Sequence, residues 1–148
     1  GQLVAYPILK LPPGGDGLHA DVVAYVRQLE QVIIAALAEF GIPAQPYPSL
    51  TGVWTPTADG VLAKIAAIGV RVTTKRVAFH GLALNVNTDL RYFTGIIPCG
   101  ITDKPVTSMA ALRGPQDESA VRAALCRAFA AAFNFQLVPV SEADLYVV

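Results

Sequence analysis

Two segments of the chain carry apolar residues at steps of three and four, which is the pattern of an amphipathic helix. The first segment covers residues 19–40, and its stripe consists of Val22, Val26, Leu29, Ile33, Leu37 and Phe40. Gly41 fits the end of this helix, and Pro43 follows it. The second segment covers residues 117–134, with Asp117 as its cap and a stripe of Val121, Leu125, Phe129 and Phe133.

The remaining apolar runs are short and predict β-strands over residues 2–9, 62–68, 70–73, 77–86, 96–100 and 136–140. Pro7 makes the first of these an edge strand or an irregular one. Gly69 is expected to interrupt the strand pattern between residues 62–68 and 70–73. Residues 42–60 are rich in Pro and Gly and are expected to be irregular, except for a short pairing segment at 52–54. Residues 88–94 predict a helical turn capped by Thr88 or Asp89. Strands flanked by two packed helices predict an α+β domain with a mixed or antiparallel sheet.

The composition supports one folded domain spanning residues 1–148 and excludes several classes of protein. The chain is 53% hydrophobic and 15% charged, which is enough apolar material for a core. Eleven basic and eleven acidic residues cancel, so no electrostatic attraction to nucleic acid or to an anionic membrane is expected. Mean hydropathy is +0.48, yet no apolar run approaches the roughly 20 residues that span a bilayer. No export leader precedes the first strand, so a reducing, cytoplasmic compartment is expected.

Cys99 and Lys64 are the residues best suited to chemistry. Cys99 stands between Pro98, which fixes the incoming backbone, and Gly100, which permits an unusual turn. That setting can present a thiol at a strand end, although a free cysteine can equally be a small buried apolar residue. Lys64 interrupts an apolar run and is either a solvated residue on an exposed strand face or a desolvated ammonium near a reacting group. Such a cation would favour the thiolate, which is the nucleophilic form of cysteine.

Other reactive residues predict less. His80 lies in a β-like run, so a Cys–His dyad is possible, with Asn85 or Asp89 as the third group; a packed or backbone-bonded histidine is the competing interpretation. Cys126, beside the second helical stripe, is expected to have a structural role, and His19 to lie on the surface. The two Cys and two His show no paired spacing typical of a metal site. The sequence contains no GxxxxGK[ST] or GxGxxG phosphate-binding loop.

Four ordered blocks then point to a family. They are GQLVAYPI (residues 1–8), GVW (52–54) followed by KIAAIGVR (64–71), FHGLALNVN (79–87), and Phe93 followed by IPCG (97–100) with VTS (106–108). Their order and spacing resemble those of the octanoyl-[acyl-carrier-protein]–protein N-octanoyltransferases of lipoate biosynthesis. The resemblance covers nearly the whole chain. It implies an α+β fold shared with the biotin and lipoate protein ligases.

The resemblance also implies a mechanism without cofactor or metal. The thiolate of Cys99 would take an octanoyl group from octanoyl-acyl carrier protein as a thioester. A lysine of a lipoyl domain, in 2-oxoacid dehydrogenases or the glycine cleavage H protein, would then attack it to give an amide. Lys64 would lower the pKa of the Cys99 thiol and shuttle protons. The acyl site would be lined by Ala67, Ile68, Gly69, Gly81, Leu82 and Ala83, with Tyr6 and His80 as neighbours. A monomer that needs no ATP, nucleic acid or membrane is expected.

One departure from the family pattern concerns the first residues. The family has an RGGxxTxHGPGQ motif, of which only the last two residues match here, as Gly1 and Gln2. The absent Arg-Gly-Gly and His would form part of the acyl site, so the chain is expected to lack the family's N-terminal portion. Three other functions stay open: an ATP-dependent lipoate or biotin protein ligase, a non-catalytic fragment that binds carrier or lipoyl domains, and a thiol hydrolase.

Overall fold

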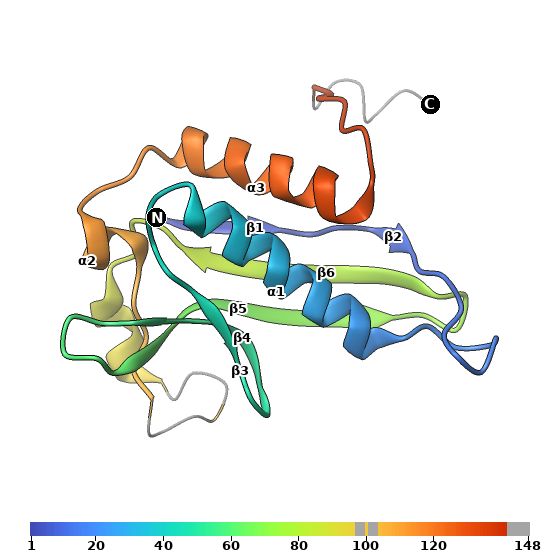
Figure 1. The fold of residues 1–148 in the computed structure, drawn as a ribbon, viewed down its shortest axis with the longest axis horizontal. Coiled ribbons are helices and arrows are strands. Elements are labelled where there is room, and N and C mark those ends of the chain that lie inside the picture. The colour runs from blue at the N-terminus through green and yellow to red at the C-terminus, as the bar shows by residue number, and fades with distance from the viewer. Residues whose placement is uncertain (97–99, 101–103, 142–148) are drawn as a thin grey trace.

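The computed structural model describes residues 1–96, 100 and 104–141 (Figure 1). It is an α+β fold, as predicted, with a six-stranded sheet in the order β1-β6-β5-β4-β3, in which β2 also pairs with β6. The strands are β1 Gln2–Ala5, β2 Leu9–Lys10, β3 Gln45–Tyr47, β4 Leu50–Pro56, β5 Leu62–Val72 and β6 Val77–Asn85. The helices are α1 Val22–Ala38, the 3-10 helix η1 Leu90–Gly95, α2 Met109–Arg113 and α3 Glu118–Phe133. All of these strand pairs are antiparallel.

The two predicted helices form, and local signals set their ends. The Asp21 carboxylate accepts a hydrogen bond from Ala24 N at the start of α1, and Gly41 takes a positive φ of 66° just beyond its end. The Asp117 carboxylate accepts from Ser119 N at the start of α3, and Asn134 closes that helix with φ 53°. These polar and left-handed residues satisfy backbone groups that a helix end leaves without partners.

The strand predictions are partly confirmed. The first run divides into β1 and β2 around Pro7, and β1 lies at the edge of the sheet. The predicted break at Gly69 is wrong, because β5 continues through it and Gly69 pairs directly with Gly81. Residues 42–60 are more regular than expected, since β3 and β4 form a hairpin there.

The prediction of a last strand over residues 136–140 is also wrong. These residues form no strand, and Leu137, Val138 and Val140 are exposed. β-forming side chains need a neighbouring strand, and none of the described strands pairs with them. The strand expected over residues 96–100 lies mostly outside the described residues.

Helices α1 and α3 pack side by side on one face of the sheet (Figure 1). Residues of both helices join β4, β5 and β6 in the main apolar core, which includes Ile33, Val53, Leu84 and Leu125. On the opposite face of β1, β5 and β6, none of the described helices packs, and exposed residues such as Val4 and Tyr6 lie there. The helix-free face is therefore where an external molecule can reach the sheet. Within the described part of the chain, no helix is long and apolar enough to cross a bilayer.

Candidate functional site

Lys64 is brought to the helix-free face by an irregularity in the sheet. Val53 pairs with Ala66 and Trp54 pairs with Lys64, so Ile65 is an extra residue on β5. Ile65 and Ala66 are both fully buried in the core beneath the helices. Because successive strand residues point to opposite faces, Lys64 on one side of this pair and Ala67 on the other both point away from the helices. Strict alternation would have put them on opposite faces.

The Lys64 side chain is buried, with only 7% of the residue exposed, so a solvated position is excluded. Its Nζ lies 5.1 Å from the centre of the Trp54 ring, a cation–π contact. Among the described residues, no carboxylate forms an ion pair with it. The Trp54 Nε1 group is likewise buried without a hydrogen-bond partner in that part of the chain. A buried cation without a carboxylate partner in the described part of the chain costs the fold stability.

The chain that follows Cys99 returns to Lys64. Lys64 N donates to Pro105 O (2.8 Å), and Thr107 N donates to Lys64 O (2.9 Å), which forms a parallel bridge between Lys64 and Val106. Cys99 itself lies outside the described residues. Gly100 has φ 69°, the left-handed conformation expected for a glycine that permits an unusual turn.

The segment just before Cys99 contains the 3-10 helix η1, which confirms the helical turn expected over residues 88–94. Asp89, one of its two expected caps, accepts from Arg91 N. Hydrogen bonds from the Arg91 side chain and backbone lower the pKa of Asp89 to about 2. The carboxylate therefore stays ionised, and the cap persists, over the physiological pH range.

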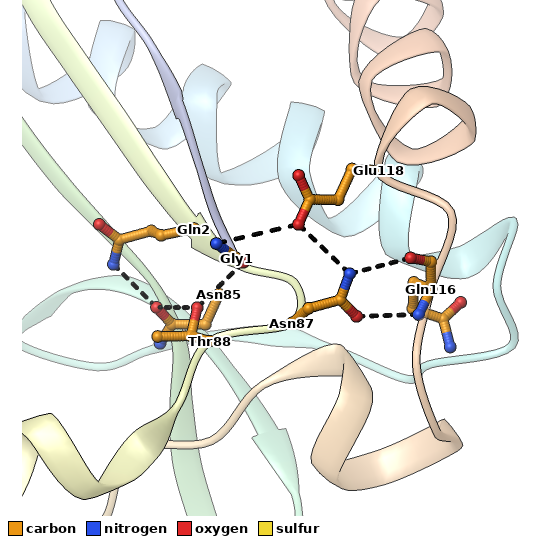
Figure 2. A network of polar contacts seen from close by, with 7 residues as sticks. All are labelled: Gly1, Gln2, Asn85, Asn87, Thr88, Gln116 and Glu118. Carbon is orange, nitrogen blue, oxygen red and sulfur yellow. Dashed lines mark hydrogen bonds and ion pairs between the residues drawn. The ribbon is translucent and has the colours of Figure 1, made fainter.

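Asn85 joins three parts of the site at the end of β6. Its Nδ2 donates to Thr107 O (3.0 Å), and its Oδ1 accepts from Gln2 Nε2 (2.9 Å). Figure 2 shows the Gln2 and Thr88 side chains turned toward Asn85, while Asn87 reaches Gln116 before α3 and Glu118 at the first position of that helix. The Asn85 amide is thus committed to tying β1 and the segment after Cys99 to β6. It makes no hydrogen bond to His80 among the described residues.

Replacing Asn85 by alanine is expected to lower the free energy of unfolding by about 1–3 kcal/mol, because Thr107 O loses its buried donor. Gln2→Ala is the matched control, since Gln2 is exposed and Asn85 would keep its bond to Thr107; its effect should stay within about 0.5 kcal/mol. Urea unfolding of both variants measures the difference. Equal losses in the two variants would contradict a structural role for the Asn85–Thr107 bond.

A groove of about 620 Å³ lies on the helix-free face, over β1, β5 and β6. Few side-chain atoms cover the backbone at its floor, because small residues pair there across β5 and β6: Ala67 with Ala83, and Gly69 with Gly81. The lining includes all eight residues expected at an acyl site: Tyr6, Ala67, Ile68, Gly69, His80, Gly81, Leu82 and Ala83. The structure brings these residues together, while their role in binding stays a prediction.

His80 has an unusual backbone. It is exposed and takes φ 63° within β6, a left-handed conformation that is uncommon for a residue other than glycine. Its ring lies 6.2 Å from the Tyr6 ring in an edge contact and 4.9 Å from the Phe79 ring. No described carboxylate orients the ring, and Asp89 is held by Arg91 instead. His80 therefore forms part of the groove wall with Tyr6.

The other expected residues have simpler outcomes. His19 is exposed and pairs with Asp16, as expected of a surface residue. The structural role expected for Cys126 is wrong, because its thiol is free and exposed on α3. Among residues 1–96, 100 and 104–141, no group of three or more His, Cys, Asp or Glu is arranged to hold a metal ion.

Sequence reasoning missed Glu30, a fully buried carboxylate on α1. A signal was present: Glu30 stands four residues after Val26 and three before Ile33, so it occupies the apolar stripe. A charged residue at a stripe position predicts a buried, partnered charge rather than a solvated one.

Comparison with known proteins identifies the family. Residues 1–132 match the lipoyl protein ligase A/B catalytic domain. The chain belongs to this family. It is 52% identical to an octanoyltransferase of Solibacter usitatus over 94% of this chain and 58% of that protein. It is 42% identical to an octanoyltransferase of Thermosynechococcus vestitus over 99% of this chain and 61% of that protein. These matches confirm the resemblance found in the four sequence blocks.

Solved structures of two protein ligases share the fold. A bipartite lipoate protein ligase of Thermoplasma acidophilum superimposes with a TM-score of 0.63 at 19% identity, covering 95% of this chain and 55% of that one. The apo biotin protein ligase of Aquifex aeolicus gives a TM-score of 0.65 at 19% identity, covering 90% and 53%. The chain spans between about two-fifths and three-fifths of the length of the octanoyltransferases it matches. It thus contains the common catalytic fold over part of their length.

Proposed function

We propose that the protein carrying this chain is an octanoyltransferase of protein lipoylation that acts in the cytoplasm. It moves an octanoyl group from octanoyl-acyl carrier protein to a lysine of a lipoyl domain, of a 2-oxoacid dehydrogenase or a glycine cleavage H protein. The observation that carries the proposal is the buried Lys64 ammonium without a carboxylate partner among the described residues, on the strand to which the chain after Cys99 returns. Two octanoyltransferases whose sequences are 52% and 50% identical to this chain support the same activity.

The proposed reaction has two thiol-dependent steps. The Cys99 thiolate attacks the octanoyl thioester carbonyl, and the carrier thiol leaves with a proton, so Cys99 holds the octanoyl group. The amine of the acceptor lysine then attacks this thioester, its proton is removed, and Cys99 leaves as the thiol. An amide replaces a thioester, so no ATP is consumed.

Lys64 is proposed to favour the thiolate form of Cys99 and to pass the protons in both steps. A positive charge near a cysteine stabilises its thiolate, and this effect is stronger where water is excluded. The burial of Lys64 supplies that dry setting. Among the described residues, Trp54 offers the ammonium only its ring face, so the hydrogen-bond donors of the ammonium are left for a reacting group.

The groove on the helix-free face is proposed to bind the octanoyl chain. It continues along β5 from the position of Lys64, beginning with Ala67. A floor of glycine and alanine allows a thin alkyl chain to lie close to the backbone, and the apolar Val4 and Tyr6 add contact area. The charged end of Arg71 lies 5.7 Å from the Phe79 ring at the far end of this strand pair.

The decisive experiment is the intact mass of the protein after mixing with octanoyl-acyl carrier protein. A single octanoyl adduct is expected in the Cys126→Ser background and none in the Cys99→Ser, Cys126→Ser double variant. Cys126 is replaced because its thiol is exposed. Circular dichroism of both proteins shows whether they are folded. An adduct that survives in the double variant would refute Cys99 as the nucleophile.

Three further measurements distinguish the other functions. Formation of an acyl-adenylate from ATP and free octanoate, independent of Cys99, would indicate a ligase. Release of free octanoate without an amide product would indicate a hydrolase. Binding of a lipoyl domain without any adduct would indicate a non-catalytic module.

A further inference from the structure

Glu30 is a charged residue that the proposed reaction does not use. It lies on α1, on the face that packs against the sheet, and its exposed fraction is 0%. A buried carboxylate is tolerated only when it is paired and hydrogen-bonded. Its partners therefore show what it does.

Glu30 links α1 to the start of β4. Arg27 Nη1 donates to Glu30 Oε1 (3.0 Å) and to Oε2 (2.7 Å), and Gly52 N donates to Oε1 (3.0 Å). Arg27 is 47% exposed, whereas the Gly52 bond is buried. The carboxylate thus fixes a backbone group of β4 from the helix side of the sheet.

Gly52 in turn lies against Lys64. It has φ 118°, and a Cβ built there would lie 2.6 Å from Ala66 O, 3.1 Å from Lys64 Cε and 3.5 Å from Lys64 Nζ. The Gly52 backbone is thus one wall of the Lys64 site, and Trp54, two residues further along β4, supplies the ring on another side. Both walls belong to the strand that Glu30 holds.

We infer that Glu30 is a positioning residue. It holds the Gly52 backbone and thereby keeps the Lys64 side chain buried in a single orientation. The inference rests on the proposed function only for its effect on turnover; the positioning itself is a property of the fold. Arg27 neutralises the carboxylate from the solvent side, while the hydrogen bond to Gly52 carries the effect to Lys64.

The test measures the exposure of Lys64 directly. The full-length protein is treated with a small amine-acylating reagent under native conditions, and labelling of Lys64 is compared by peptide mass with that of the exposed Lys10 and Lys75. Glu30→Ala is expected to raise labelling of Lys64, relative to those two lysines, by at least about tenfold through local opening of β4. Glu30→Gln keeps an oxygen that can accept from Gly52 N and should stay within about threefold of the parent.

Leu29→Ala is the matched control. Leu29 is the neighbouring residue on α1 and is also fully buried, but it packs with Leu11, Tyr25 and Ala78, away from Gly52. Leu29→Ala should lower the stability of the protein but leave the labelling of Lys64 within about twofold of the parent. Positioning by Glu30 would be overturned by a folded Glu30→Ala protein with unchanged Lys64 labelling. It would also be overturned if Leu29→Ala exposed Lys64 equally, or if Glu30→Gln behaved as Glu30→Ala.

Steady-state kinetics separate this inference from the proposed function. Glu30→Ala is expected to lower kcat for octanoyl transfer by at least about tenfold with KM for octanoyl-acyl carrier protein unchanged, because the groove lies apart from Gly52. Raised labelling with unchanged kcat would leave the positioning intact and refute the catalytic role of Lys64. Unchanged labelling with reduced kcat would refute positioning and leave that role standing.

Discussion

Replacing Lys64 by methionine is expected to slow octanoyl transfer by about 10²–10⁴-fold, the usual contribution of a proton-transferring side chain. Methionine keeps a long unbranched side chain against Trp54 but removes the charge. The protein should stay folded, because a buried ammonium without a carboxylate partner among the described residues is removed rather than created. Transfer is measured with octanoyl-acyl carrier protein and a lipoyl domain.

Alkylation of Cys99 tests the same residue without substrates. In the Cys126→Ser background, Lys64→Met should slow the reaction of Cys99 with iodoacetamide near neutral pH by about tenfold or more, since less thiolate is present. Lys75→Met is the control, because Lys75 is exposed in the turn between β5 and β6. A rate unaffected by Lys64→Met would refute activation by the ammonium.

Replacing Gly81 by alanine is expected to lower the free energy of unfolding by about 3 kcal/mol, at the upper end of overpacking effects. A Cβ at Gly81 would overlap Ala5 O and lie 2.6 Å from Pro7 Cδ, so the end of β1 must move away. That movement would break the pairing of Ala5 with Leu82 and open the groove beside Tyr6. Urea unfolding measures the loss.

Gly69 provides a control at the same level of the sheet. It pairs directly with Gly81 across β5 and β6, but a Cβ there has no atom within 4 Å. Gly69→Ala should therefore be neutral, or more stable by about 0.5 kcal/mol, because alanine restricts the unfolded chain. If both substitutions destabilised equally, the close approach of β1 to Gly81 would not be the cause.

The helices and most of the sheet could be predicted because their signals are local. The stripe of α1 and the caps Asp21 and Asp117 act within a few residues. The error at Gly69 had a non-local cause, since a glycine breaks a strand only when neighbouring strands do not hold it, and β6 holds this one. The error at residues 136–140 was of the same kind, because β propensity does not supply a strand to pair with.

The sequence named candidate residues for the site but could not supply their geometry. Sequence alternation could not decide the face of Lys64, because the extra residue Ile65 depends on the register with β4. The role of Glu30 was hidden for a similar reason, since its partner Gly52 lies on another element. Contacts that depend on strand register and on packing between elements produce no strong local pattern in a single sequence.

Trp54 gives the site an optical signal of its own. It is the only tryptophan of the chain, so all of the indole fluorescence arises beside the Lys64 ammonium. A change in the charge or position of Lys64 should therefore alter the tryptophan emission of these 148 residues without any attached dye. The acylation and deacylation proposed for Cys99 could then be followed in real time by stopped flow. If the emission stayed constant during a measured burst of acylation, Lys64 would not move in that step.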